Sequence, residues 1–449
     1  MMGINYLWLY TLLTVLTCVM SFVKRNSLIY RLIWLEYSVI AVCTLLCVLF
    51  QTELLGHAGL LDYWYSLDRT TLQGYLLLFA CTWLALRPLA SFGSGRELVT
   101  FGKSETEKQL FLAFTIIYLL AAVAFVALSM SSVKAALSTS DYGSLRSDLY
   151  SGTDNESSLV LATNPIASLA FKFCNLFKYI GIVIAFGMMK EKFHPVLAIG
   201  LIFTIFGIYY IYASANAARG GLMVFCFCAV ILASLLYGFL SPGYRKRIMV
   251  GACALGGLVF SIVAAITISR FADDGGGGNA IVRNVMFYLG HAPIEFSTIT
   301  GSVSKYGGGE VILGRLFAHW FGAPYSWEAV SLRIGFPQFG PLFITYLGYL
   351  FSDFGYIGCL LFATIWAAFL SALLKNSPCR LSTLVLLGYY ISFYVTGAFT
   401  LGRLEFASLV TFHAIWLFLR FWEEVLDRPM KSYPNPDITG GALHVRGKD

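Results

Sequence analysis

The chain carries little charge for its length. Only 12% of its 449 residues are Asp, Glu, Lys or Arg and 58% are hydrophobic, whereas about a quarter of the residues in an average soluble domain are charged. The mean hydropathy is +0.73. This composition excludes a soluble globular domain. The net charge of +7 is attributed to the basic loops of a membrane protein, so no nucleic-acid partner is inferred.

Several signals that would assign other classes are also missing. No basic segment precedes the first apolar run and no small-residue cleavage site follows it, so the run is predicted to be a retained anchor. Neither Gly275–Gly278 nor Gly307–Gly309 is followed by the Lys-Ser/Thr of a phosphate loop. Cysteines fall in or beside apolar runs, and Cys226 and Cys228 have no metal-site spacing. No metal or cofactor is predicted.

Apolar runs long enough to cross a membrane recur along the whole chain. A hydrocarbon layer about 30 Å thick needs about 20 helical residues. Eleven runs fit this length: Tyr6–Val23, Leu32–Phe50, Leu72–Ala90, Leu110–Met130, Leu169–Met189, Val196–Tyr212, Leu222–Leu240, Met249–Ile268, Tyr356–Leu374, Leu381–Phe399 and Leu404–Phe421. We expect an all-α polytopic membrane protein with about eleven transmembrane helices, in the range of ten to twelve.

Lys and Arg cluster in every second connection, which predicts that those connections face the cytoplasm. The predicted segments are eight spans in 1–268 with an outer loop at 131–165, a large outer loop at 269–355, three spans in 356–421 and a cytoplasmic tail at 422–449. The apolar stretch Leu342–Phe351 is too short to span unaided. We expect it to be a partly inserted helix that breaks before the span beginning near Tyr356.

The outer loops gather residues suited to glycosyl transfer. That chemistry needs a base for the acceptor hydroxyl and positive charge for a leaving pyrophosphate. Candidates for the catalytic group are Asp353, Glu295 and His291, and the sequence does not select one of them from the other acids and His319. Candidates for substrate binding are five arginines, one lysine and two aromatic residues that would stack on sugar rings: Arg219, Arg283, Arg315, Arg333, Arg403, Lys178, Trp320 and Tyr325.

Several candidates also have a structural interpretation. Asp353 is well placed to cap the helix that starts near Phe354. Arg219 would reach ordinary lipid headgroups, and Arg403 would pair with Glu405. The tryptophans and tyrosines would form an interfacial belt. Lys178 lies in or near a span, where a cation is unfavourable unless it lines water or meets an anion.

Two stretches resemble a known family. Phe339–Gly358, FGPLFITYLGYLFSDFGYIG, is similar to the segment that follows the large periplasmic loop in bacterial O-antigen and oligosaccharide repeat-unit polymerases. Ala218-Arg219-Gly220-Gly221-Leu222 resembles the small-residue-Arg-Gly turn at the mouth of a span in that family. The two motifs cover roughly 30 residues, while the eleven-span pattern with one dominant outer loop extends the likeness along the chain.

The resemblance implies a multi-span glycosyltransferase of the bacterial inner membrane that works on the periplasmic side. It would move a growing glycan from undecaprenyl pyrophosphate to a new lipid-linked repeat unit, with outer-loop arginines on the substrates. A chain-length regulator protein and membrane lipid are the implied partners. No nucleotide sugar or metal is implied, which agrees with the absence of an Asp-x-Asp triplet. The alternatives are an O-antigen ligase, with His291 or His319 as its catalytic histidine, and a transporter or flippase of lipid-linked oligosaccharide.

Overall fold

A computed structural model describes residues 2–49, 70–92, 105–138, 164–215, 219–237, 240–271, 289–314, 317–318, 321–322, 325–335, 345–375, 380–399 and 403–426. These parts of the chain are helical and contain no strand. Eleven of their helices have 15 residues or more: α1 (Met2–Val23), α2 (Leu28–Leu49), α4 (Leu72–Leu86), α5 (Glu105–Ser138), α8 (Pro165–Lys190), α9 (Pro195–Ala215), α10 (Arg219–Tyr237), α11 (Pro242–Phe271), α16 (Leu347–Lys375), α17 (Leu381–Phe399) and α18 (Arg403–Leu426).

Each predicted apolar run coincides with one of these helices. Within the described residues, eight of the helices are long and apolar enough to cross a membrane: α1, α2, α4 with the short 3-10 helix η2 (Arg87–Ser91), α5, α8, α9, α16 and α17. The apolar part of α10, Gly221–Tyr237, is shorter, and α11 and α18 are not among the eight. The chain is therefore an all-α polytopic membrane protein, as predicted, while the eleven-span topology stays a prediction.

Local chemistry fixes several helix ends. Asn164 caps α8, since its Oδ1 accepts from the N–H groups of Ile166 and Ala167, and Pro165 occupies the first helical position, where its missing N–H is harmless. Between α8 and α9 the chain reverses with Lys192 and His194 at φ values of 55° and 43°. This short turn makes α8 and α9 antiparallel neighbours.

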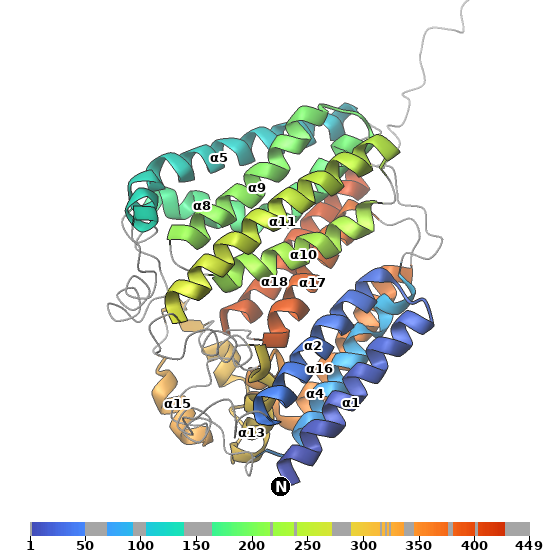
Figure 1. The fold of residues 1–449 in the computed structure, drawn as a ribbon, viewed down its shortest axis with the longest axis vertical. Helices are drawn as coiled ribbons and strands as arrows, with labels where there is room; N and C mark the ends of the chain where they lie inside the picture. Colours follow the sequence, from blue (N-terminus) through green and yellow to red (C-terminus); the bar gives the residue numbers. More distant parts are fainter. Residues whose placement is uncertain are drawn as a thin grey trace, which may run out of the picture.

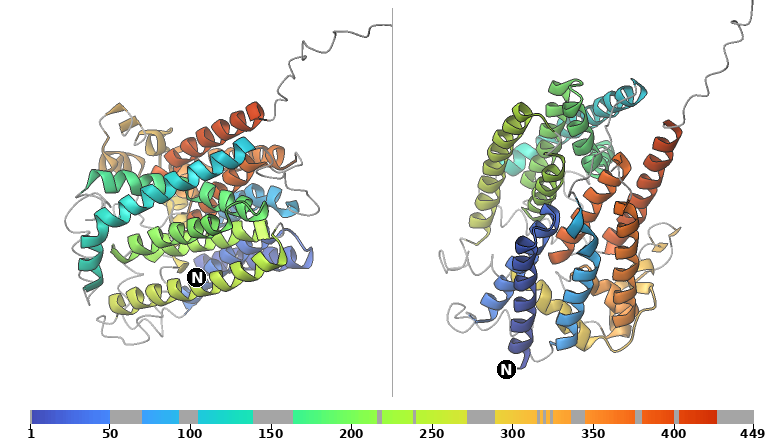
Figure 2. Two further views of the ribbon diagram at one scale, coloured as in Figure 1. Left: turned by 90° about the horizontal axis from the view of Figure 1, so that it is seen from above. Right: turned by 90° about the vertical axis from the view of Figure 1, so that its right-hand side faces the viewer.

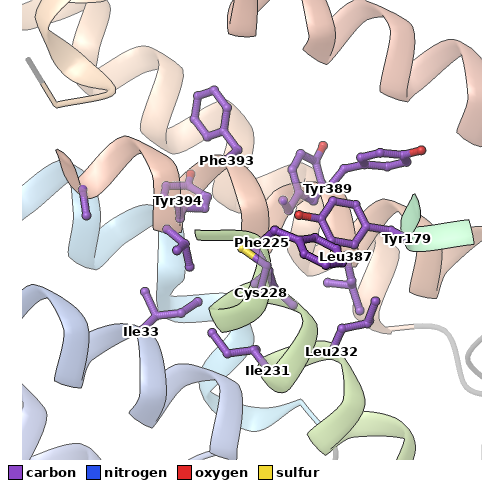
Figure 3. Packing of buried hydrophobic residues seen from close by; sticks show 14 of the residues in the cluster. Ile33, Tyr179, Phe225, Cys228, Ile231, Leu232, Leu387, Tyr389, Phe393 and Tyr394 are labelled. Carbon is purple, nitrogen blue, oxygen red and sulfur yellow. The ribbon is translucent and has the colours of Figure 1, made fainter. Parts of the chain in front are cut away.

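The long helices form two groups that share a core. The groups are α1, α2, α4 and α16, and the larger set α5, α8, α9, α10, α11, α17 and α18 (Figure 1). Helices α10 and α17 pack against α2 and so join them. Figure 3 shows this junction, where Ile33 of α2 lies near Cys228 and Ile231 of α10. Tyr394 of α17 is completely buried beside them and accepts a hydrogen bond at its carbonyl from Tyr37.

The two ends of the bundle differ in character. Helix α13 (Ala292–Ser302) and helix α15 (Trp327–Ile334) lie at the end where α1 begins, while α18 finishes at the other end (Figure 1; Figure 2, right). We call the first the cap end. The opposite end carries a concentration of positive charge in turns and terminal helix residues: Lys24, Arg25, Arg31, Arg87, Lys108, Lys190, Lys192, Arg245, Lys246, Arg247, Lys375, Arg380 and Arg420.

Candidate functional site

At the cap end, α13 is embedded among the ends of the long helices. Every residue from Ala292 to Thr300 is buried. Gly290, just before the helix, lies against the backbone of α2, because a Cβ there would sit 2.7 Å from the Thr44 nitrogen. Helix α13 packs on α2, α4 and α16. The sequence predicted loop at this place, so a buried helix inside 269–355 is a difference from the expectation.

A seam of hydroxyl groups joins α13 to α4. The Thr71 N–H donates to Ser297 Oγ at 2.9 Å, and Ser297 Oγ donates back to the Thr71 carbonyl at 2.9 Å. Thr71 Oγ1 also lies 2.7 Å from Thr300 Oγ1 and caps α4 by accepting from the Gly74 N–H. A Cβ on Gly74 would collide with Thr300, so only glycine permits this approach. These hydrogen bonds hold α13 in one position relative to the start of α4.

His291 and Glu295 lie one turn apart at the start of α13. His291 Nε2 is 3.7 Å from Glu295 Oε1, and the two side chains are 2% and 1% exposed. The Glu295 N–H donates to the His291 carbonyl at 3.0 Å, which keeps the two residues on one face. The 3.7 Å separation is longer than a hydrogen bond, so the two groups are close neighbours that a small rearrangement would bring into contact. The pair therefore has the chemistry of a general base, held in a water-poor setting.

Asp353 of α16 holds a neighbouring turn in place. Its side chain is 1% exposed, and its Oδ1 and Oδ2 accept from the N–H groups of Val311 and Ile312 at 2.9 and 2.8 Å. Those donors belong to the short π-helical turn η3 (Glu310–Gly314). A Cβ on Gly307 would lie 2.5 Å from Asp353 Oδ1, so the glycine run before η3 can approach the carboxylate closely. Both carboxylate oxygens are thus engaged by backbone, which is the geometry of a positioning residue.

Helix α16 is interrupted just after Asp353. Gly355 has a φ of 62° and a ψ of −158°, a backbone conformation that glycine adopts readily and residues with a side chain rarely do. Its missing side chain leaves room for the Tyr306 ring, since a Cβ would lie 2.5 Å from Tyr306 Cζ. The sequence predicted a break between Leu342–Phe351 and the span starting near Tyr356, and the interruption lies there, although residues 336–344 are outside the described parts.

Helix α15 and the residues just before it carry two of the predicted substrate-binding residues. Arg333 of α15 pairs with Glu310 of η3 at the protein surface, where the two side chains are 55% and 40% exposed. Tyr325 packs over Gly314, whose Cβ position lies 2.8 Å from the tyrosine ring. We use the name cap for residues 289–302 with α13, for η3, and for residues 325–334 with α15. The cap thus presents an arginine and an aromatic ring beside the carboxylate-bound turn.

Lys178 lies away from the cap, on α8 within the larger helix group. Its Nζ donates to Asn175 Oδ1 at 2.9 Å and to the hydroxyl of Tyr209 in α9 at 2.7 Å. The Tyr209 hydroxyl donates to Asn175 in turn. The structure therefore separates this predicted binding residue from the three catalytic candidates.

The remaining predicted residues are described only in part or not at all. Arg219 and Arg403 are the first residues of α10 and α18, but their side chains lie outside the described structure. Arg283, Arg315 and Trp320 lie outside the described residues, and their roles stay predictions.

The function of this site has to be inferred from its own geometry. No family model, no curated protein and no solved structure matches the chain. In the part of the chain that the structure describes, no group of three or more His, Cys, Asp or Glu side chains is arranged to hold a metal ion. His291, Glu295, Asp353, Arg333 and Tyr325 all lie in the cap or the first part of α16, at one end of the bundle, and this is the main functional observation.

Proposed function

We propose that this protein polymerises lipid-linked oligosaccharide repeat units. It transfers the growing glycan from undecaprenyl pyrophosphate to a newly delivered unit. The observation that carries the proposal is the buried His291–Glu295 pair on α13, set 3.7 Å apart in a cap that also carries Arg333 and Tyr325. An acid–base pair, an arginine and an aromatic ring at one end of an apolar bundle suit a reaction between two lipid-anchored sugars.

In the proposed reaction His291 takes the proton from the acceptor hydroxyl while Glu295 orients the imidazole. The acceptor oxygen then attacks the anomeric carbon, and the bond to the carrier pyrophosphate breaks. Guanidinium groups stabilise the departing pyrophosphate because their fork binds two phosphate oxygens at once. Arg333 and the Arg219 at the start of α10 are the proposed groups for this. Because His291 and Glu295 are 2% and 1% exposed, the side chains that cover them have to move to admit the acceptor.

We also propose that the chain resides in the bacterial inner membrane with the cap end facing the periplasm. Basic residues concentrate at the other end, and positive charge is typical of the cytoplasmic side. The substrates would then meet the cap after they have crossed the bilayer. A separate chain-length regulator protein is the proposed partner, with membrane lipid around the apolar helices.

Deletion of the coding sequence in the host, followed by complementation, tests this function. Wild type is expected to restore a ladder of long surface glycans on an electrophoretic profile, and His291→Ala or Glu295→Gln to leave single repeat units on the surface acceptor. Glu424→Gln is the matched control, because its carboxylate is exposed and pairs with Arg420 one turn earlier. It should restore the full ladder.

The same profile, together with the leaflet in which lipid-linked sugar accumulates, separates the other functions. An acceptor without any repeat unit would contradict polymerisation. Lipid-linked sugar accumulated in the outer leaflet would then indicate a ligase, for which the buried His291 is the specific supporting feature. Accumulation in the inner leaflet would instead indicate a flippase.

A further inference from the structure

The first half of α8 carries a polar stripe that the proposed reaction does not use. Lys172, Asn175 and Lys178 follow each other at intervals of three residues, so they lie on neighbouring turns of one side of the helix. Lys172 and Asn175 are exposed and Lys178 is half-buried. From Tyr179 to Met189 every residue of α8 is buried. The polar stripe is therefore confined to the half of the helix that starts at the cap end.

The two lysines have no carboxylate partner among the residues that the structure describes. The described ion pairs include neither of them. Lys178 instead bonds to Asn175 and Tyr209 and lies 5.1, 4.9 and 5.9 Å from the ring centres of Tyr179, Tyr209 and Phe225. An ammonium group has three N–H donors, so one donor remains for a ligand.

Lys178 lies near the middle of α8 and nearly two turns inside the cap-end termini of α9 and α10. Tyr209 is six residues from the end of α9 and Phe225 is six residues from the start of α10. At a rise of about 1.5 Å per residue, the ammonium lies roughly 9 Å inside those helix ends. Lys172 lies nearly two turns closer to the cap end. Cations at such depths are retained where they meet an anion or line water.

We propose that the stripe binds the phosphate group of an amphiphile that enters from the bilayer at the cap end. The two ammonium groups supply the charge, the Asn175 amide donates to a phosphate oxygen, and the aromatic rings around Lys178 exclude water from the contact. Exposed Ile166 and Leu169 on the preceding turns give an apolar surface for the attached chain. This site lies on α8 outside the cap, and it goes beyond the proposed glycosyl transfer because it requires only a phosphate.

Binding to the purified full chain in detergent tests the site. The probes are farnesyl phosphate, phosphatidylglycerol and inorganic phosphate. Farnesyl phosphate is expected to bind wild type and to lose at least tenfold in affinity in Lys178→Ala. Lys172→Ala and Asn175→Ala, which change exposed side chains, should each lose severalfold without loss of folding. Lys190→Ala is the matched control, since it removes a lysine from the buried half of the same helix, where it pairs with Glu191.

The probes also identify the source of the phosphate. Stronger binding of farnesyl phosphate than of inorganic phosphate, lost in the stripe variants, supports a lipid-borne group. Equal binding of phosphatidylglycerol with the same loss supports a common headgroup, and binding of inorganic phosphate alone supports a free anion. Affinities that are the same in wild type, Lys172→Ala and Asn175→Ala would overturn the site. Because the readout is binding, a stripe that binds phosphate in a protein without glycan activity would refute only the polymerase proposal.

Discussion

At the scale of single residues, Asp353 holds η3 in place through two backbone N–H groups. Its position at the end of a short apolar stretch indicated a buried carboxylate with a specific partner, and its side chain is buried. The partner was not predictable, because Val311 and Ile312 precede it by about forty residues and donate through their backbone. His291 and Glu295 were named from their type, and only the fold shows them as a pair.

Asp353 gives the first prediction. Asp353→Ala leaves two buried N–H groups without an acceptor, and each such loss destabilises by about 1–3 kcal/mol. We expect a lower unfolding temperature in detergent and faster proteolysis within 307–335. Asp353→Asn keeps one acceptor oxygen and should fall between wild type and Ala.

The same variants distinguish positioning from catalysis. If Asp353 positions η3, glycan synthesis should decline in proportion to the loss of stability. An Asp353→Asn protein that is as stable as wild type but makes no polymer would show instead that the carboxylate reacts directly.

At the scale of elements, the long helices were predictable and the short one was not. Apolar runs of membrane length identified the positions of all eleven long helices, and Leu381–Phe399 has the same bounds in the structure. Helix α13 was not predicted from the sequence, because its eleven residues include Ser, Thr and Glu and show no apolar periodicity. Its burial depends on Thr71, which comes more than two hundred residues earlier. Pro293, close to the N-terminus of the helix, was the one local signal.

The seam between α4 and α13 gives the second prediction. Gly74→Ala places a methyl group against Thr300 Oγ1 and 2.9 Å from the Ser297 Cα, so α13 has to move as a unit. We expect thermal stability and polymer length to fall together. Gly207→Ala in α9 is the control, because nothing lies within 4 Å of the added methyl. Equal effects of the two changes would contradict a fixed position for α13.

The far end of α18 gives a pH prediction. Burial raises the pKa of the Glu423 carboxyl above its ordinary 4.5, although Ser382 donates to it from both N–H and O–H. A carboxyl with a raised folded pKa contributes stability that is complete below its ordinary pKa and is lost as pH rises through the folded value. Glu423→Gln stays neutral and removes that dependence.

Unfolding temperatures of wild type and Glu423→Gln should therefore diverge with pH. Wild type is expected to lose stability relative to the Gln variant over the pH range that begins at the ordinary pKa of 4.5 and extends upward. Ser382→Ala should destabilise wild type by about 1 kcal/mol through loss of the hydroxyl bond. A constant difference between wild type and Glu423→Gln across this range would show that the carboxyl titrates normally.

At the scale of the whole molecule, sequence and structure agree on the class of the protein. A low charge content and repeated apolar runs predicted a polytopic helical membrane protein, and the described helices form one. The division into two helix groups joined through α2, α10 and α17 was not predictable, because it depends on packing between apolar surfaces that look alike in sequence. The concentration of basic residues at one end did follow from their spacing along the chain.

Reconstitution of the purified chain in proteoliposomes with lipid-linked repeat units is the decisive experiment for polymerisation. A polymerase should produce a series of longer lipid-linked glycans and release free polyprenyl pyrophosphate in step with each bond formed, and Glu295→Gln should lose both activities. Substrate that stays one unit long, or that only changes leaflet, would contradict polymerisation.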